Sequence, residues 1–338
     1  MLNVLIFLFF INIILFLSFD YLSKKIKIYD FPDKRRKLHN IPTPCIGGVF
    51  LFINIFILYI LSIFNKNFFY NFFIFNSHEA SYVFIISTLF IFIIGIIDDK
   101  IKLNSYLRFL LLIILSYFVS LNDNFRIEYL TFSFIEINID LRPYSYIFTI
   151  ICFLLFINAF NFYDGINLQN GIYSLILSLV IIYHNPGILF FYVVLFFLFF
   201  FLTLNFKKKI FLGDNGTYLL ALIFGLYFIK LYNDRIILHA DEIFIVMLVP
   251  GLDLFRLFFE RIFKGKNPFF PDRNHIHHLL LKKMGYLKVN FILGLLNIVP
   301  YFLYKLIPQK YFIIITIIIL YFFIIFYLKK NVKNIKQK

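Results

Sequence analysis

Two adjacent carboxylates, Asp98 and Asp99, end an apolar stretch that is otherwise rich in Ile and Phe. Two neighbouring carboxylates in apolar surroundings cannot both stay ionised without a cation, so the pair predicts either a bound metal or one raised pKa. The alternative is a solvated loop that begins after a membrane helix. The pair is therefore a hypothesis about chemistry whose weight depends on what other polar residues lie nearby.

A second polar cluster, Gly213-Asp214-Asn215-Gly216, follows three lysines at 207–209 and precedes a long apolar segment. If a helix begins there, its free backbone N–H groups and its dipole favour a phosphate. A carboxylate in that place suits Mg²⁺, which shares phosphate oxygens with its protein ligands. The alternative is an Asp that caps the helix between two turn glycines.

Three polar residues at intervals of three, Asn158, Asn161 and Asp164, share one face if the helix before them continues. Two amides and a carboxylate can recognise a nucleobase or complete a metal shell. Gly165 is expected to stop the helix in a left-handed conformation, with an Asn as the cap, and this structural role is compatible with either function.

Three histidines, His275, His277 and His278, follow Asp272 and Arg273. Asp272 can cap a short helix that puts His275 and His278 on one face, with His277 turned aside. The histidines and Arg273 would then form a cationic surface for a diphosphate. A zinc site is the competing interpretation, but no cysteine or further ligand follows at a usual spacing.

A fifth cluster lies near the N-terminus, where Asp30-Phe-Pro32 leads into a basic run and then into Gly47-Gly48. This run can contact phosphate, although a basic loop is also expected on the cytoplasmic side of any membrane protein. Its candidate phosphate-binding residues are Arg35, Arg36, Lys37 and His39.

The elements that must position these clusters are apolar helices. Crossing about 30 Å of hydrocarbon takes about 20 apolar residues, and runs of that length predict an all-α polytopic membrane protein with eleven transmembrane helices. The first is expected to be a retained helix, because it lacks the basic start and the cleavage site of a signal peptide. The predicted spans are 1–19, 45–63, 79–97, 105–121, 144–160, 170–185, 187–205, 217–232, 241–258, 288–306 and 310–328.

The composition agrees with a membrane protein. Of the 338 residues 62% are apolar and 52 are Phe, so a water-facing fold could not hide this apolar surface and a cytosolic globular enzyme is excluded. The two cysteines, Cys45 and Cys152, are too few for a disulfide framework. We expect one transmembrane domain over 1–328 and a basic tail over 329–338.

The positions of the charged residues predict the orientation. Most of the 33 Lys and Arg residues fall in alternate loops, which places the N-terminus outside and the C-terminus inside. All five polar clusters then lie on the cytoplasmic side. The net charge of +15 indicates attraction to anionic membrane lipids and not to nucleic acid. Alternating residues over 126–140 predict a small β-hairpin on the outside. The expected cytoplasmic loops are 20–44, 98–108, 161–169, 206–216 and 259–288.

Taken together and in this order, the five clusters resemble the polyprenyl-phosphate N-acetylhexosamine-1-phosphate transferase superfamily, glycosyltransferase family 4. The motifs cover the chain from about 30 to 280. The His-Ile-His-His form is similar to the branch that acts on undecaprenyl phosphate and UDP-GlcNAc-type donors, and not to the branch that transfers phospho-MurNAc-pentapeptide. The motifs are Asp-x-Pro, Arg-Lys-x-His, Pro-x-x-Gly-Gly, Asp-Asp, Asn-x-x-Asn-x-x-Asp-Gly, Gly-Asp-x-Gly and Gly-Lys-x-Pro-Phe-x-x-Asp-Arg-x-His-x-His-His-Leu-Leu.

The resemblance implies a Mg²⁺-dependent enzyme of the bacterial inner membrane with a cytoplasmic active site, Mn²⁺ being the alternative metal. Undecaprenyl phosphate attacks the β-phosphorus of a UDP-N-acetylhexosamine, UMP leaves, and the lipid-diphosphate sugar starts a cell-envelope polysaccharide. Neither the sugar nor the pathway is specified, and monomer and homodimer both stay open.

The resemblance also implies roles for individual residues. Asp214 and Asp99 would bind the metal, with Asp98 and Asp99 near the lipid phosphate. It leaves open which carboxylate is the base and whether a covalent intermediate forms. The implied catalytic residues are Asp98, Asp99, Asp164, His275, His277 and His278. The implied substrate-binding residues are Arg36, Lys37, His39, Asn158, Asn161 and Arg273.

The chain departs from the family pattern in three places. Asn167 stands where the family usually has a second Asp, which removes a negative charge beside the nucleotide site and bears on the choice of donor. The basic run between Pro32 and Gly47 is one residue longer than usual, and Cys45 stands where a basic residue is common. None of these changes removes a proposed metal ligand.

Two other classes of protein are the alternatives. A secondary transporter predicts charges near the bilayer midplane and some repeat symmetry. In this chain the carboxylates lie at cytoplasmic helix ends, and Asp253 and Arg256, at i and i+3, are expected to pair near such an end. A non-catalytic protein that binds lipid-linked sugars predicts loss of the clustered carboxylates, which are present.

Overall fold

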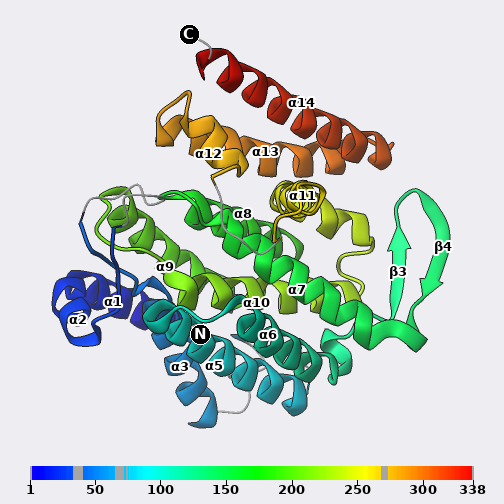
Figure 1. Ribbon diagram of the computed structural model, residues 1–338. Helices are drawn as coiled ribbons and strands as arrows, with labels where there is room; N and C mark the ends of the chain where they lie inside the picture. Colours follow the sequence, from blue (N-terminus) through cyan, green and yellow to red (C-terminus); the bar gives the residue numbers. More distant parts are fainter. Residues whose placement is uncertain are drawn as a thin grey trace.

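The architecture of the protein is described from a computed structural model, which covers residues 2–32, 41–64, 72–73, 75, 77–267 and 273–336. Helices dominate this part of the chain, and Figure 1 shows α10 in the middle of them. The α-helices are α1 (Leu2–Leu17), α2 (Phe19–Ile26), α3 (Gly47–Phe64), α5 (His78–Ile101), α6 (Ser105–Ser120), α7 (Ser145–Tyr163), α8 (Gln169–His184), α9 (Leu189–Phe206), α10 (Gly213–Asn233), α11 (Ala240–Phe263), α12 (Ile276–Leu281), α13 (Tyr286–Leu306) and α14 (Lys310–Lys336).

All eleven segments predicted as membrane helices are helical. Within the described residues, six helices are long and apolar enough to cross a membrane, or seven if the bent pair α1 and α2 forms one span. The six are α5, α7, α9, α10, α13 and α14, with α7 extended to start at Arg142 and α14 counted to Lys330. α3 and α6 are shorter apolar helices. The prediction of helices is therefore confirmed, whereas the number of crossings stays a prediction.

The first predicted helix is shorter than expected. α1 ends at Leu17, and the chain turns by 69° into the polar helix α2. The hydroxyl of Ser18, at the bend, donates to the carbonyl oxygens of Ile14 and Leu15. Side-chain bonds of this kind compete with the helix ladder and are a common cause of bends.

α10 is the core helix of the molecule. Every residue from Asn215 to Tyr232 is buried, and the helix packs against α3, α5, α7 and α8. A helix that is apolar on all sides is stable only when other elements surround it. Glycines allow the close packing, because a Cβ on Gly48 would lie 2.2 Å from the nitrogen of Gly216 and one on Gly95 would lie 2.3 Å from Cα of Asn215. The start of α10 is thereby fixed against α3 and α5.

A short strand pair attaches the chain before α10 to the N-terminal region. β1 (Tyr29–Asp30) pairs antiparallel with β2 (Thr43–Pro44). The N–H of Phe211 donates to the carbonyl of Pro44, and the N–H of Gly48 donates to the carbonyl of Leu212. Residues far apart in the sequence therefore meet at the start of α10.

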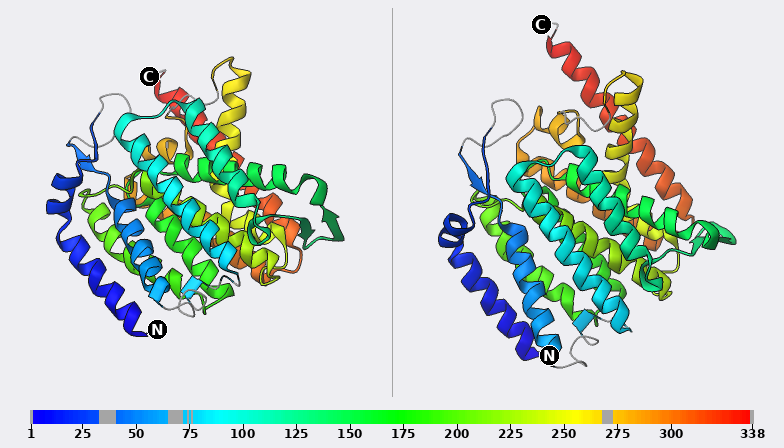
Figure 2. Two further views of the ribbon diagram at one scale, coloured as in Figure 1. Left: turned by 90° about the horizontal axis from the view of Figure 1, so that it is seen from below. Right: turned by 60° about the horizontal axis from the view of Figure 1, so that its bottom comes forward.

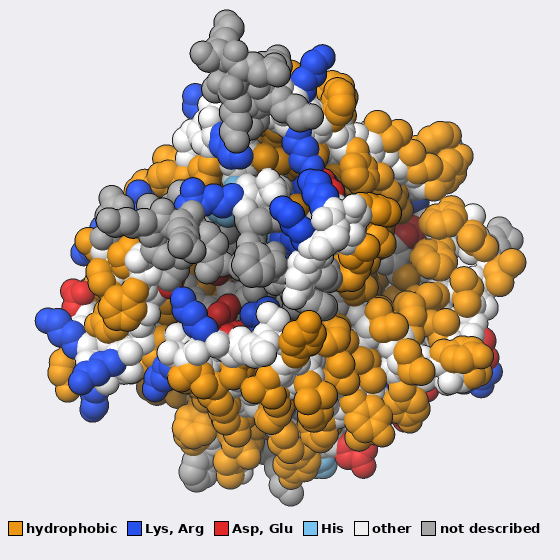
Figure 3. Space-filling model, in the orientation of Figure 1, with side chains coloured by type: hydrophobic (Ala, Val, Ile, Leu, Met, Phe, Trp, Pro, Cys, Tyr) orange, Lys and Arg blue, Asp and Glu red, His pale blue; other side chains and the backbone are white. Residues whose placement is uncertain are grey.

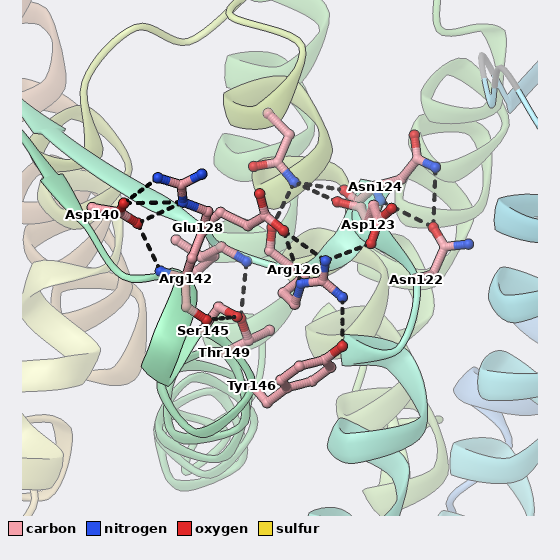
Figure 4. A network of polar contacts seen from close by, with 12 residues as sticks. Asn122, Asp123, Asn124, Arg126, Glu128, Asp140, Arg142, Ser145, Tyr146 and Thr149 are labelled. Carbon is pink, nitrogen blue, oxygen red and sulfur yellow. Dashed lines mark hydrogen bonds and ion pairs between the residues drawn. The ribbon is translucent and has the colours of Figure 1, made fainter.

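The predicted β-hairpin is present. β3 (Tyr129–Phe132) pairs antiparallel with β4 (Ile135–Asp140), between the short 3₁₀ helices η1 (Asp123–Phe125) and η2 (Arg142–Tyr144). Figure 4 shows the polar contacts at its base, where Arg126 bonds Glu128 at 2.6 Å and the Tyr146 hydroxyl at 2.9 Å. On its other side the N–H of Ser133 donates to Asp241 of α11 at 2.9 Å. These contacts attach the hairpin to α7 and α11.

Candidate active site

One cavity of about 820 Å³ gathers most of the residues predicted to act in chemistry. It lies between the C-terminal ends of α5 and α7, the N-terminal end of α10, and α12. Figure 3 shows acidic and basic side chains together in a hollow of the surface, with apolar side chains over α5 and α6 below it. The predicted residues that line the cavity are Asp98, Asp99, Asn161, Asp164, Asp214, Arg273, His275, His277 and His278.

Some predicted site residues are not found in this cavity. Asn158 is not among the residues that line it, and its amide donates to the carbonyl of Leu154 within α7 at 2.7 Å. α7 ends at Tyr163, so Asp164 follows the helix and does not continue the face that carries Asn158. The predicted residues Arg36, Lys37 and His39 lie outside the described residues, as does Asp272.

The two adjacent carboxylates face different partners. Asp98 is buried, accepts the Tyr218 hydroxyl at 2.8 Å and the N–H of Leu103 at 2.9 Å, and lies 3.4 Å from Arg108. The positive charge of Arg108, from α6, thus balances part of the negative charge of the Asp98–Asp99 pair. No sequence pattern indicated Arg108 as a site residue. The turn from α5 to α6 brings it back to Asp98 across ten positions of the sequence.

Asp99 holds the first turn of α10. Its carboxylate accepts the backbone N–H groups of Asp214 at 2.9 Å and Asn215 at 3.0 Å, and the Asn215 amide at 2.5 Å. The expectation that these helix N–H groups are free for a phosphate is therefore wrong, because a carboxylate from α5 already occupies two of them. Nor does Asp214 act as the N-cap, since Leu212 stands at that position.

The carboxylates of Asp214 and Asp164 lie close together at the cavity wall. Asn161 donates to Asp214 at 2.7 Å, and the Thr217 hydroxyl donates to Asp164 at 3.2 Å. The surrounding protein raises the pKa of Asp164 to about 7, and the charge of Asp214 adds to this shift, whereas the Thr217 bond opposes it. Because Asp164 also faces the open cavity, its carboxylate remains accessible to a ligand.

Gly165 has a different role from the predicted one. It does not adopt a left-handed conformation; the glycines that do in the described part of the chain are Gly213 and Gly265. A Cβ on Gly165 would instead lie 1.8 Å from Nε2 of His277. Glycine is required here because an imidazole packs against the backbone that follows α7.

The three histidines differ in accessibility. His277 is 1% exposed, and its Nδ1 lies 3.3 Å from the amide nitrogen of Gln169. Burial and the neighbouring His278 and His275 lower the pKa of His277 well below its usual value, so the ring is neutral at pH 7. His277 thus joins α12 to the chain between α7 and α8, whereas His278 is only partly buried.

The cavity also has a basic wall that sequence patterns did not indicate. Lys102, Arg108 and Lys208 line it together with Arg273. Lys208 has a positive φ of 56° and its ammonium lies 5.4 Å from the ring centre of Tyr286. The sequence did not indicate which of the three lysines at 207–209 faces the cavity. Acidic and basic groups facing one cavity suit a ligand that carries phosphate and a metal ion.

The carboxylates of the cavity are donors of the kind that Mg²⁺ takes. In the described residues no three His, Cys, Asp or Glu side chains form a group that could hold a metal alone. Mg²⁺ usually takes one or two protein carboxylates and completes its shell with water and phosphate oxygens. Asp214, with Asp99 beside it, offers such a partial site, because Asn161 binds one Asp214 oxygen and the carboxylate lines the cavity.

The apolar helices indicate a multi-pass membrane protein, and its cavity carries acidic and basic side chains. Comparison with known proteins makes this class more specific. The profile of glycosyl transferase family 4 matches residues 81–232, which include α5, α7 and α10. This segment of the chain is similar to that family.

Curated relatives from bacteria match a larger part of the chain. The undecaprenyl-phosphate alpha-N-acetylglucosaminyl 1-phosphate transferase of Thermotoga maritima is 26% identical over 80% of this chain and 79% of its own length. The enzyme of the same name from Salmonella typhi is 25% identical over 80% of this chain and 75% of its own. That of Escherichia coli K12 is 23% identical over 77% and 71%.

Proposed function

We propose that this protein transfers N-acetylhexosamine 1-phosphate from a UDP-sugar similar to UDP-GlcNAc to undecaprenyl phosphate. UMP and a lipid-diphosphate sugar that starts envelope polysaccharide synthesis are the products. The observation that carries the proposal is the single cavity in which carboxylates from α5, α10 and the end of α7 face histidines and basic side chains. The names of the bacterial relatives support the same reaction.

The reaction forms one P–O bond and breaks another. An oxygen of the lipid phosphate attacks the β-phosphorus of the donor, and the bond from that phosphorus to the oxygen bridging to the α-phosphorus breaks. The bridging oxygen leaves with the electron pair as part of UMP. Two anionic reactants must be held in line while their charges are neutralised. The basic wall of Lys102, Arg108, Lys208 and Arg273 provides part of that neutralisation.

The carboxylates have separate tasks in this proposal. Asp214, oriented by Asn161, and Asp99 would hold Mg²⁺, which when bound neutralises phosphate charge and orients the phosphate oxygens. Asp164 is the carboxyl that would accept a proton from the lipid phosphate, because it faces the open cavity and its surroundings raise its pKa to about 7. Asp98 supports the site through its bonds to Arg108 and Tyr218.

The histidine segment would bind the diphosphate of the donor. His275, His278 and Arg273 line the cavity opposite the carboxylates and can donate to phosphate oxygens. Asn167, which stands where the family usually has an Asp, lines the cavity, and its amide donates to the carbonyl of Asn205. We propose that this position bears on donor choice.

We further propose that the eleven apolar helices cross the bacterial inner membrane with the cavity on the cytoplasmic side. The distribution of Lys and Arg supports this orientation. The two ends of the chain lie at opposite ends of the molecule in both views of Figure 2, as an odd number of crossings requires. Cytoplasmic UDP-sugars would then reach the cavity directly.

The proposal is tested by measuring UMP release from purified protein in detergent with undecaprenyl phosphate, Mg²⁺ and each of several UDP-N-acetyl sugars. We expect lipid-dependent UMP from one donor and no UMP in EDTA. Asp214→Asn is expected to lower kcat at least about 100-fold, since it removes a preorganised charge from the site.

Asp241→Asn is the control, because Asp241 is a buried carboxylate that bonds Ser133 and Tyr304 near the hairpin and does not line the cavity. We expect this variant to keep its activity within about twofold. If the folded wild-type protein releases no UMP from any donor, or releases it without lipid, the proposed function is wrong.

A further inference from the structure

A buried carboxylate on α11 contacts the segment that carries the histidines. Asp253 is 2% exposed, and its Oδ2 lies 2.8 Å from Nδ1 of His275. Its Oδ1 accepts the backbone N–H of Ile276 at 3.1 Å. Ile276 is the first residue of α12, and His275, at the N-cap position, makes no side-chain cap bond. Asp253 therefore supplies from another helix the acceptor that a capping side chain would supply.

Two further donors fix the orientation of the Asp253 carboxylate. Its Oδ1 also accepts Nη2 of Arg256 at 2.7 Å and the hydroxyl of Tyr321 at 2.7 Å. The same Arg256 Nη2 donates to the carbonyl of Asn274 at 2.7 Å. The predicted pairing of Asp253 with Arg256 is thus confirmed, and it extends to α14 and to the residue before His275. A buried charge held by this many donors is kept in one geometry.

These contacts decide which atom of His275 meets a ligand. His275 lines the cavity, and with its Nδ1 on Asp253 the remaining ring nitrogen is Nε2. When neutral, the ring carries its proton on Nδ1, and a second proton on Nε2 makes it a charged donor to phosphate. A carboxylate on the far nitrogen fixes the orientation of the ring. The titratable groups facing His275 are Asp253 and Arg256 on α11, Tyr321 on α14, and His277 and His278 on α12.

We propose that Asp253 is a positioning residue that holds Nδ1 of His275 and so turns Nε2, which donates once it carries a proton, toward the diphosphate of the nucleotide sugar. This inference rests on the proposed function and deepens it. Asp253 lies beyond residues 81–232, so the family profile does not include it. The signal in the sequence was an Asp and an Arg at i and i+3 inside an apolar helix, which indicated an ion pair but not its contact with the histidines.

The variant Asp253→Asn tests this directly because it keeps the shape of the side chain. Three donors meet at Oδ1, so the amide oxygen takes that place and the NH₂ group faces Nδ1 of His275. The ring must then accept on Nδ1, so its one proton lies on Nε2 and the charged ring, protonated on both nitrogens, is no longer compatible with its neighbour. We expect kcat/KM for the UDP-sugar to fall about 10–100-fold, as for other carboxylates that orient a functional histidine.

A double-mutant cycle separates positioning from general support of the fold. In a His275→Asn background, Asp253→Asn is expected to cause no further loss beyond about twofold, since the residue through which Asp253 acts is absent. If the two losses multiply instead, Asp253 does not act through His275 and the inference is overturned. Asp241→Asn, on the same helix and equally buried, is the matched control and is expected to keep wild-type kcat/KM.

A second readout does not depend on turnover. In long-range ¹H–¹⁵N spectra of protein labelled in histidine, the His275 signals are assigned by their loss in His275→Asn. We expect the Nδ1–H tautomer of neutral His275 in the wild type and the Nε2–H tautomer in Asp253→Asn. The same tautomer in both proteins would overturn the inference. If the wild type released no UMP from any donor, the proposed function would fail while this experiment still decided the role of Asp253.

Discussion

The carboxylates of the cavity differ in how much of their hydrogen-bonding capacity the protein already uses. Asp98 is occupied by Tyr218, Leu103 and Arg108, and Asp99 by the first turn of α10. Asp214 and Asp164 each have one side-chain donor and face the cavity. Adjacent acids in the sequence are therefore not equivalent. The two that are best placed for a ligand come from separate elements, Asp164 from the end of α7 and Asp214 from α10.

Asp164 is expected to make the metal-free protein less stable as the pH rises. The pKa of its carboxyl is about 7 in the folded protein, against an ordinary value of 3.8. Between these values the folded state binds more protons than the unfolded state, so the free energy of unfolding falls with rising pH. Asp164→Asn cannot ionise. We therefore expect its Tm in EDTA to rise relative to that of the wild type as the pH is raised from about 4 to about 7.5.

The measurement is the difference in Tm between the two proteins across a pH series in detergent. Asp123→Asn serves as the control, because the Asp123 side chain is 83% exposed and its pair with Arg126 contributes little to stability. A difference that stays constant across the series would show that Asp164 titrates in the folded protein as it does in an unfolded chain. Added Mg²⁺ should reduce the difference, since a bound cation favours the carboxylate.

At the scale of elements, sequence patterns predicted the helices well and their junctions poorly. Apolar runs and the need to satisfy backbone polar groups define each helix locally. The contact of Asp99 with the start of α10 joins residues more than a hundred positions apart and depends on how closely α5 and α10 approach. The role of Gly165 likewise depends on the position of His277, which no local pattern specifies.

The close contact between α5 and α10 is expected to depend on Gly95. Gly95 lies one turn before Asp99, and a Cβ there would be 2.3 Å from Cα of Asn215 and 2.6 Å from its nitrogen. Since backbone atoms cannot move aside cheaply, Gly95→Ala should separate the helices and cost about 1–3 kcal/mol of stability. It should also lower UMP release, because the bonds from Asp99 to α10 would lengthen. Tm and activity are the measurements.

Gly251→Ala is the matched control for this prediction. Gly251 also lies inside a helix, α11, but nothing lies within 4 Å of the added Cβ. Replacing a helical glycine by alanine without a clash stabilises a protein by about 0.5–1 kcal/mol. Opposite signs of the change in Tm are therefore expected for the two variants, and equal stabilisation by both would mean that α5 and α10 do not meet at Gly95.

At the scale of the whole molecule, the sequence predicted which residues share a site because topology constrains them. Polar clusters at alternate helix ends must lie on one side of a membrane, and all five predicted clusters contribute to one cavity, the N-terminal cluster through Asp30. Asn158 is the exception. It lies about one helical turn before Asn161 in α7, does not line the cavity, and bonds the carbonyl of Leu154. Sequence patterns did not predict three further residues of the site, Arg108, Lys208 and Asp253. A charged residue at a helix end can have several roles, and only the packing of the folded chain shows which role it has.

The proposed orientation predicts which surface cysteines a membrane-impermeant maleimide reaches in spheroplasts. Phe134, between β3 and β4, and Lys264, after α11, are both exposed, and five helices from α7 to α11 separate them. If each helix crosses the membrane, the two positions lie on opposite faces. In a background with Cys45 and Cys152 changed to Ser, we expect Phe134→Cys to react before lysis and Lys264→Cys to react only after it. The reverse order would invert the proposed topology, and reaction of both before lysis would mean that fewer of these helices cross the membrane.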